Sequence, residues 1–304
     1  MNRPGNKVRC FRLPALIAAC LVGFVSVLNG QQILSQGSLE VDEKYLWRVK
    51  QLDQFIGRFN YEESLSGNPM HGNGEGHNGN SGNMPEAMKD AAADSMRRLV
   101  IMTLFDLVCK DCFDMGLVNE FLDQVTDENN PVKLDFYDDN WYAGLKTQIK
   151  YKGTPMDISL TMENEAYPGP KSKWVIAGAD GPFIEHVDPA GQVEKHIHPM
   201  SHETDFIDLE RAFSDRSNIE LYAARTYRHD NLSQLFDKVK SKEIVYQGVK
   251  NTKYHFLQVQ GWIFVVEHFE RNSKNSGWLI SKLIKADSRE KAKYKVENLH
   301  LYTE

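Results

Sequence analysis

Two runs of alternating apolar and polar residues, separated by a short turn, constrain the fold of this chain most strongly. The first run occupies residues 145–151 and the second occupies residues 156–162, with Gly153-Thr154-Pro155 between them. A period of two is typical of a strand with one buried face, and a Gly/Pro turn between two such runs indicates a hairpin. These residues therefore predict an antiparallel sheet with one buried and one solvated face.

Other segments add strands and helices to this hairpin. Apolar, β-favouring stretches predict further strands at 174–177, 243–249, 254–270 and 278–285. Apolar residues three and four apart predict helices at 39–63, 85–115, 117–125, 202–213 and 231–240. Ser201 would cap the fourth of these helices. Helices that come first and are then followed by strands indicate an α+β fold, with N-terminal helices packed on a curved antiparallel sheet that ends in a long C-terminal hairpin.

The first 30 residues have the composition of an export signal. Four cations precede an uncharged stretch, 13–28, and polar sequence begins at Asn29-Gly30. The stretch has 16 residues, fewer than the ~20 of a membrane-spanning helix. We therefore expect cleavage after Gly30 and a periplasmic or secreted protein, with an uncleaved N-terminal anchor as the alternative. Residues 31–304 would form a single α+β domain with a flexible Gly/Asn-rich insertion at 64–84.

The charge of the chain limits its partners. It contains 36 basic and 42 acidic residues, and four of the basic ones belong to the export signal. An acidic chain without a basic cluster is a poor ligand for nucleic acids and for anionic lipid head groups. We expect a small molecule or another envelope protein as the partner, and contact with a membrane only through an uncleaved anchor.

The densest group of potential metal ligands lies between residues 196 and 203. It consists of three imidazoles and one carboxylate: His196, His198, His202 and Glu203. Such a set could bind Zn²⁺ and leave one coordination position for a water molecule. The pattern is not HExxH, and Pro199 interrupts it, so these residues also fit an ordinary polar loop. In that case no cofactor is expected.

Two further groups carry alternative predictions. Cys109 and Cys112 are the cysteines that remain after removal of the signal, and they would form a local disulfide or stay as two buried thiols. A thioredoxin-type redox site needs a strand before the first thiol, whereas an apolar helix precedes Cys109 here. Four tryptophans could line a ligand pocket or pack in the core: Trp141, Trp174, Trp262 and Trp278.

The order of elements and the final hairpin, Lys253–Lys285 with Trp262 and Trp278, resemble the nuclear-transport-factor-2-like family, which includes exported proteins of unknown function. The resemblance covers about residues 40–287 and contains no diagnostic motif. It implies helices in the hollow of a curved sheet, with a pocket between them. It does not imply a reaction, because that family contains both enzymes and non-catalytic binders.

No catalytic motif of the GxSxG type and no phosphate-binding loop is present in the sequence. The sequence therefore favours a non-catalytic module that binds a ligand or a partner protein in the cell envelope, with its catalytic residues, if any, unknown. The first alternative is a metal-dependent hydrolase that uses the 196–203 group. The second is a thiol-active envelope protein that uses Cys109 and Cys112.

Overall fold

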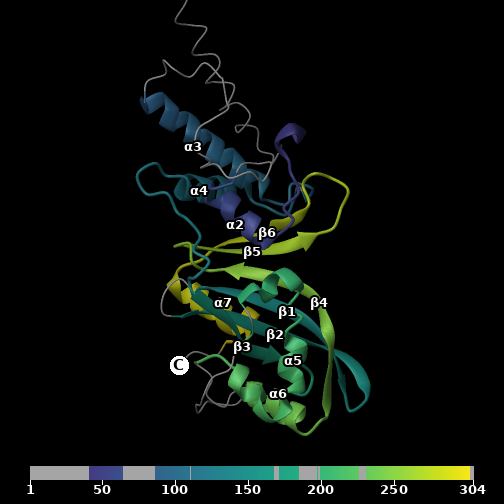
Figure 1. Cartoon of the computed structure of the whole chain (residues 1–304). Helices are drawn as coiled ribbons and strands as arrows, with labels where there is room; N and C mark the ends of the chain where they lie inside the picture. The colour runs from purple at the N-terminus through teal and green to yellow at the C-terminus, as the bar shows by residue number, and fades with distance from the viewer. Residues whose placement is uncertain are drawn as a thin grey trace, which may run out of the picture. The chain divides into compact units, whose positions relative to one another are not determined.

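The structure is a computed structural model, which describes residues 41–63, 86–109, 111–167, 171–184, 197, 199–225 and 231–301 (Figure 1). The predicted export signal at 1–30 and the predicted insertion at 64–84 lie outside the described residues. Within the described ranges, no helix has both the length and the apolar composition required to cross a membrane.

Six strands form one open antiparallel sheet in the order β3-β2-β1-β4-β5-β6. The strands are β1 (Trp141–Tyr151), β2 (Thr154–Tyr167), β3 (Lys171–Asp180), β4 (Ile244–Phe256), β5 (Trp262–Phe269) and β6 (Gly277–Lys285). Helices accompany this sheet, and β5 and β6 make the C-terminal hairpin. The α+β class predicted from the sequence is thus confirmed.

The hairpin of β1 and β2 has the register that its alternation predicts. Leu145 lies opposite Leu160, so the apolar side chains of the two strands share one face. Lys152 and Gly153 form the turn, with φ of 50° and 84°, as a two-residue type I′ turn requires. The turn therefore begins before the predicted Gly153-Thr154-Pro155, because Thr154 already belongs to β2.

The second half of the sheet differs from the prediction in its strand boundaries. The sequence predicts strands at 243–249 and 254–270, whereas β4 continues to Phe256 and β5 begins only at Trp262. The chain turns between them, and Gly261 has a φ of 79°. Leu257 and Val259 are buried in this turn. Because apolar residues continue through the turn, the hydrophobic pattern alone does not reveal it.

The outer edge of β6 is covered by two segments of the N-terminal half. The amide of Val49 donates to the carbonyl of Ser276 at 3.0 Å, and its carbonyl accepts from Trp278 at 2.9 Å. The carbonyl of Leu104 accepts from the amide of Ile280 at 2.7 Å. Both segments form isolated parallel bridges to β6. Backbone groups that pair with a strand are not free to continue a helix.

The predicted helices at 39–63 and 85–115 are therefore too long. The N-terminal elements are η1 (Glu43–Tyr45, a 3₁₀ turn), α2 (Leu52–Phe59), α3 (Glu86–Thr103) and α4 (Met115–Val125). The side chain of Asn275 also holds the end of α3, donating to the carbonyls of Thr103 and Phe105 at 3.3 and 2.9 Å. α4 agrees with the predicted helix at 117–125.

The described part of the chain between β3 and β4 contains four helical elements: η2 (Pro199–Thr204), α5 (Leu209–Ser214), η3 (Arg216–Tyr222) and α6 (Asn231–Lys240). α6 confirms the predicted helix at 231–240. The prediction of one helix over 202–213 is wrong. The chain turns at Asp205 and Phe206, whose φ values are 49° and 55°, and this turn separates η2 from α5.

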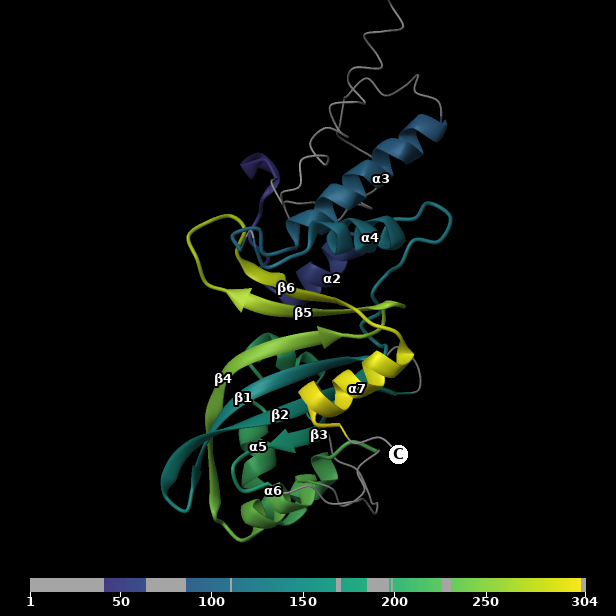
Figure 2. The same cartoon turned by 180° about the vertical axis from the view of Figure 1, so that it is seen from behind.

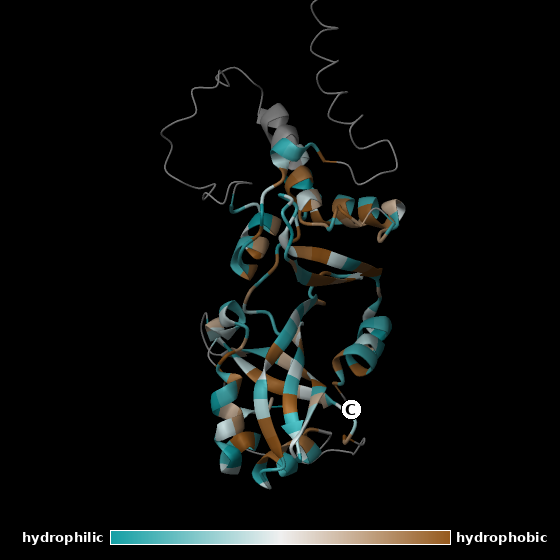
Figure 3. Cartoon of the chain, turned by 90° about the vertical axis from the view of Figure 1, so that its right-hand side faces the viewer, coloured by the Kyte–Doolittle hydropathy of each residue, from teal (hydrophilic) through white to brown (hydrophobic). Residues whose placement is uncertain are grey.

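The last helix, α7 (Ser288–Leu299), is absent from the predictions because its residues are mostly hydrophilic (Figure 3). Its first turn is closed by a capping box, in which the side chains of Asp287 and Glu290 each accept from the other residue's amide at 2.8 Å. Tyr294 and Leu299 are its buried residues. A helix with so narrow an apolar stripe depends on the sheet beneath it.

Helices cover both faces of the sheet. Seen from opposite sides, α7 lies on one face of β1, β2 and β3, whereas α5 and α6 lie on the other (Figures 1 and 2). The buried cluster that includes residues of α7 consists of Tyr142, Val175, Ala177, Ala224, Leu257, Ile263, Ala286, Tyr294, Leu299 and Leu301. α2 and α4 contact β6.

A row of aromatic rings crosses the face of the sheet opposite α7. We call it the aromatic row, and its members, in spatial order, are Phe59, Phe264, Phe256, Trp141, Trp174 and Phe206. Successive ring centroids are 5.8, 4.9, 5.4, 4.9 and 5.2 Å apart. All six side chains are buried. The row therefore connects α2 to the turn between η2 and α5 through rings from four strands of the sheet, β5, β4, β1 and β3.

We expect Gly277→Ala to destabilise the fold strongly. A Cβ at Gly277 would lie 1.9 Å from the carbonyl oxygen of Val49, and φ is 85°. Gly261→Ala is the matched control, because φ there is 79° but no atom lies within 4 Å of the added carbon. The control should lose only the ~1–2 kcal/mol of a left-handed backbone, and Gly277→Ala at least ~3 kcal/mol of unfolding free energy in denaturant titrations. Equal losses would contradict the role assigned to Val49.

His255 should make stability depend on pH. Burial, followed by Lys253 and Lys282, lowers the pKa of His255 to about 4, and its Nδ1 lies 2.8 Å from the hydroxyl of Tyr294. As the pH falls from ~6.5 to ~4, the unfolded chain takes up this proton first, so the folded state should lose ~3 kcal/mol of stability.

The comparison of His255→Asn with wild type, by chemical denaturation at several pH values, measures this contribution. The variant should lose less stability than wild type between pH 6.5 and 4. His268→Asn, at an exposed histidine, is the control and should keep the wild-type slope. A wild-type slope in His255→Asn would refute the assignment.

Candidate metal centre

Two of the four predicted metal ligands lie next to one another in η2, and a third group joins them from α2. His202 and Glu203 are neighbours in η2, and Asp53 lies in the first turn of α2. One ligand atom from each of these residues lies within 4.8 Å of the other two. The other two predicted ligands, His196 and His198, lie outside the described residues.

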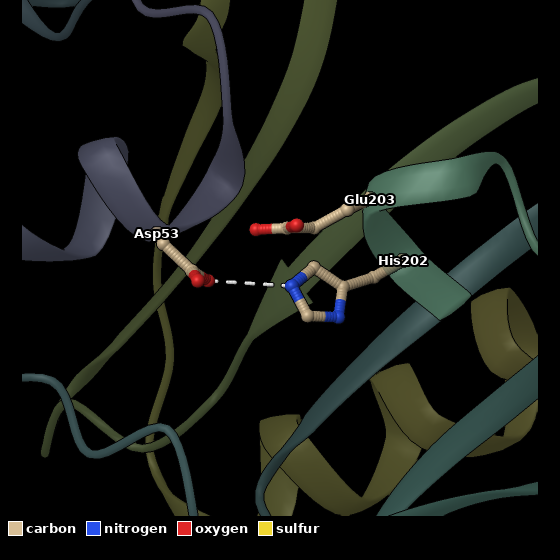
Figure 4. Close-up of side chains that lie close together, drawn as sticks. All are labelled: Asp53, His202 and Glu203. Atoms are coloured by element: carbon tan, nitrogen blue, oxygen red, sulfur yellow. Dashed lines mark hydrogen bonds and ion pairs between the residues drawn. The ribbon is translucent and has the colours of Figure 1, made fainter. Parts of the chain in front are cut away.

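The three side chains converge from two sides (Figure 4). The Oδ1 atom of Asp53 lies 3.3 Å from Nε2 of His202. The carboxylate of Glu203 points from η2 towards Asp53, above the edge of the imidazole ring (Figure 4). Asp53 and Glu203 are exposed, whereas the side chain of His202 has no exposed surface. The group is therefore open to solvent on its carboxylate side only.

The hydrogen bonds of His202 orient its ring. Nδ1 lies 2.9 Å from the carbonyl oxygen of Pro199, which can only accept, so Nδ1 carries a proton. Nε2 then faces the carboxylate of Asp53, which is also an acceptor when ionised. A second proton or a metal ion on Nε2 satisfies this geometry. An N–H donated to a backbone carbonyl is the usual support of a metal-binding histidine.

Buried groups hold η2 in place around this ring. The hydroxyl of Tyr254 donates to the carbonyl of His202 at 3.1 Å, and the indole of Trp174 donates to the carbonyl of Pro199 at 2.9 Å. The rings of Phe136 and Trp174 lie 5.3 and 6.3 Å from the imidazole. The position of His202 is thus fixed by the sheet, and only the carboxylates have freedom to adjust.

The break of the predicted 202–213 helix serves the same arrangement. The side chain of Phe206 is buried as the last ring of the aromatic row, 5.2 Å from Trp174. Ser201 does not cap a helix as predicted, and its hydroxyl donates to Asp208 at 2.6 Å instead. Burial of Phe206 therefore stabilises the turn that a continuous helix would not allow.

The two carboxylates have opposite pKa shifts. The hydrogen bond from His202 lowers the pKa of Asp53. Burial, and then the negative charge of Asp53, raise the pKa of Glu203. Two carboxylates this close repel each other unless a proton or a cation lies between them. The arrangement therefore favours the binding of a positive ion from solvent.

The other predicted site residues do not belong to this centre. Cys109 and Cys112 are joined in a disulfide, with Cα atoms 5.4 Å apart, in the turn between α3 and α4. Cys112 is exposed and Cys109 is half-buried. The amides at the start of α4 donate to Asp114 rather than to a cysteine.

The four tryptophans are side chains of the core. Trp141 and Trp174 belong to the aromatic row, and Trp262 packs against Phe121 with ring centroids 5.5 Å apart. Trp278 contacts Tyr254 at 4.9 Å. Each of the four is at most 8% exposed, so their rings contact protein over nearly their whole surface.

Sequence reasoning missed Asp53. It lies in a helix of ordinary amphipathic composition, 149 residues from His202, and no local pattern distinguishes it from other acidic residues. The one sequence feature that could have pointed to Asp53 is its position on the polar side of the first turn of a short helix. That signal is shared by many surface acids.

Comparison with family models, with curated proteins and with solved structures finds no match to this chain. The likeness to the nuclear-transport-factor-2-like family therefore stays a prediction. The function has to be inferred from the chain's own side chains and their geometry.

We expect Tyr254→Phe to loosen η2 without altering the sheet. The change removes the hydroxyl that donates to the buried carbonyl of His202, which should cost ~1–2 kcal/mol of unfolding free energy. Tyr246→Phe is the control, because no hydrogen bond of its hydroxyl is found among the described residues. Denaturant unfolding of both variants measures the difference, and an equal effect would contradict the proposed support of η2.

Proposed function

We propose that this chain is a non-catalytic binding module of the cell envelope, and that it binds a divalent cation at Asp53, His202 and Glu203. One observation carries the proposal. An imidazole nitrogen and two carboxylates from segments far apart in the sequence converge so that their ligand atoms lie within 4.8 Å of one another. A single metal ion bound between them would relieve the repulsion of the carboxylates and satisfy Nε2 of His202.

The donor set favours zinc among the common divalent ions. One imidazole and two carboxylates combine a nitrogen ligand with oxygen ligands, whereas calcium and magnesium prefer oxygen alone. Zinc would lie ~2.0–2.2 Å from each donor. The exposed carboxylates of Asp53 and Glu203 can move this far, while the buried ring of His202 stays in place.

Export to the periplasm or beyond the cell is part of this proposal. Its support is the signal-like composition of residues 1–30 and the disulfide of Cys109 and Cys112, a bond that persists in oxidising compartments. The partner would be a small molecule or another envelope protein.

A metal-dependent hydrolase is the second candidate, and one observation favours it. The carboxylate side of the centre is exposed, and three protein ligands would leave a coordination position for water. Hydrolysis of simple ester or phosphoester substrates that requires zinc and is lost in Glu203→Gln would favour this candidate.

Zinc titration of the metal-free full chain tests the proposed function. We expect one equivalent to bind by calorimetry, and His202→Ala to weaken binding by at least ~100-fold because it removes the nitrogen donor. Glu210→Gln, at an exposed acid of α5, is the control and should bind as wild type does. Failure of wild type to bind zinc, or full binding by His202→Ala, would refute a site at these residues.

A further inference from the structure

A third acidic side chain, that of Glu63, lies against α2 near Asp53. The side chain of Glu63 folds back over Gly57, and its Cγ, Cδ and Oε1 atoms lie 3.1, 3.2 and 3.4 Å from where a Cβ of Gly57 would be. Gly57 follows Asp53 by four residues in α2. Side chains four apart on a helix begin ~6 Å from each other on one face. The carboxylate of Glu63 therefore lies beside the position one helical turn after Asp53 in α2.

One oxygen of this carboxylate has no partner. The Oε2 atom of Glu63 is buried and makes no hydrogen bond to any residue that the structure describes. Burial raises the pKa of Glu63, the nearby Arg58 opposes this change, and Asp53 adds to it. A buried acceptor without a donor calls for a physical reason, and the binding of a cation is one such reason.

Arg58 offers a competing explanation for Glu63. Its guanidinium is buried and donates to the carbonyls of Trp47 and Arg48 at 2.8 and 3.2 Å. Its Nε makes no hydrogen bond within the described part of the chain. If Glu63 only balanced the charge of Arg58, it would stabilise the metal-free protein and would not affect the binding of a metal.

We infer that Glu63 is the fourth ligand of the cation held by Asp53, His202 and Glu203, an inference that rests on the proposed function. Two observations support this inference: the Oε2 atom of Glu63 has no partner among the described residues, and the Glu63 side chain lies beside the position one helical turn after Asp53. Rotation about the side-chain bonds of Glu63 would bring its carboxylate towards the ion beside Asp53. Gly57, which has no Cβ, leaves the surface of α2 open for this movement.

Four protein ligands define a closed site. Zinc with four protein donors is tetrahedral and has no position for a reacting water molecule, as in structural zinc sites. The ion would then fasten α2 to η2, two segments that are otherwise joined through the aromatic row. The closed site supports the binding module and excludes the hydrolase candidate.

Two neighbouring glutamates provide the test. Glu63→Gln should reduce the affinity of the full chain for zinc by ~10–100-fold. It should also weaken the visible absorption of the cobalt-substituted protein, because the ion loses its four-coordinate geometry. Glu62→Gln is the matched control, since Glu62 is exposed and pairs with Lys133 at 3.3 Å. The control should keep the zinc affinity and the cobalt spectrum of wild type.

Gly57→Ala supplies a second variant that keeps every ligand. Its methyl carbon would lie 3.1, 3.2 and 3.4 Å from Cγ, Cδ and Oε1 of Glu63, closer than ordinary contact, so the Glu63 side chain would have to shift away. Alanine favours a helix more than glycine does, so the metal-free melting temperature should not fall. Zinc affinity should fall ~10-fold, because the carboxylate is displaced from α2.

The outcomes separate the two proposals. If wild type binds no zinc, the proposed function fails and the inference fails with it. If wild type binds zinc through His202 and both Glu63→Gln and Gly57→Ala keep its affinity and cobalt spectrum, only the inference fails. A lower metal-free melting temperature in Glu63→Gln with unchanged zinc affinity would show that Glu63 only balances the charge of Arg58. That result would also refute the inference that Glu63 is a ligand.

Discussion

The aromatic row is the interaction on which the positions of the other elements depend. It begins on α2 at Phe59, includes rings from four strands and ends at Phe206 in the turn after η2, so one continuous set of ring contacts places α2 and this turn on the same face of the sheet. Buried aromatic pairs contribute surface burial together with a preferred geometry. Because Asp53 extends from α2 and His202 from η2, the distance between these two side chains is a consequence of the packing of the rings beneath them. The candidate metal centre is therefore built above the buried rings of the aromatic row.

The sequence predicts the strands better than the ends of the helices, and the reason is physical. Alternation at 145–151 and 156–162 indicates a strand with one buried face, and the whole pattern lies within the residues of the strand itself. Helix ends at residues 49 and 104 depend on pairing with β6, which lies more than 170 residues away along the chain. No local pattern carries that information. In α7 the signal at the helix start is local, because the capping box of Asp287 and Glu290 is visible in the sequence. The apolar stripe of this helix is too narrow, however, to predict that it packs on the sheet.

The candidate site divides in the same way. His202 and Glu203 could be predicted because three histidines and an acid cluster within eight residues. Asp53 could not, because it meets His202 and Glu203 only through the tertiary approach of α2 to η2. The inferred role of Glu63 could not either, because it depends on how the side chain lies against Gly57. The four tryptophans show how one residue type fits two roles. Their sequence is compatible with a pocket, whereas their burial of at least nine-tenths places them in the core.

The bridges of Val49 and Phe105 to β6 have a consequence for self-association. A bare outermost strand offers unpaired amides and carbonyls to any other polypeptide, and this is a common origin of fibrous aggregates. Here the chain covers part of its own last strand with two short parallel segments. The N-terminal segment around Val49 thus protects part of the edge of the sheet from pairing with another chain. Proteolytic loss of that segment would leave this rim available for intermolecular β-pairing.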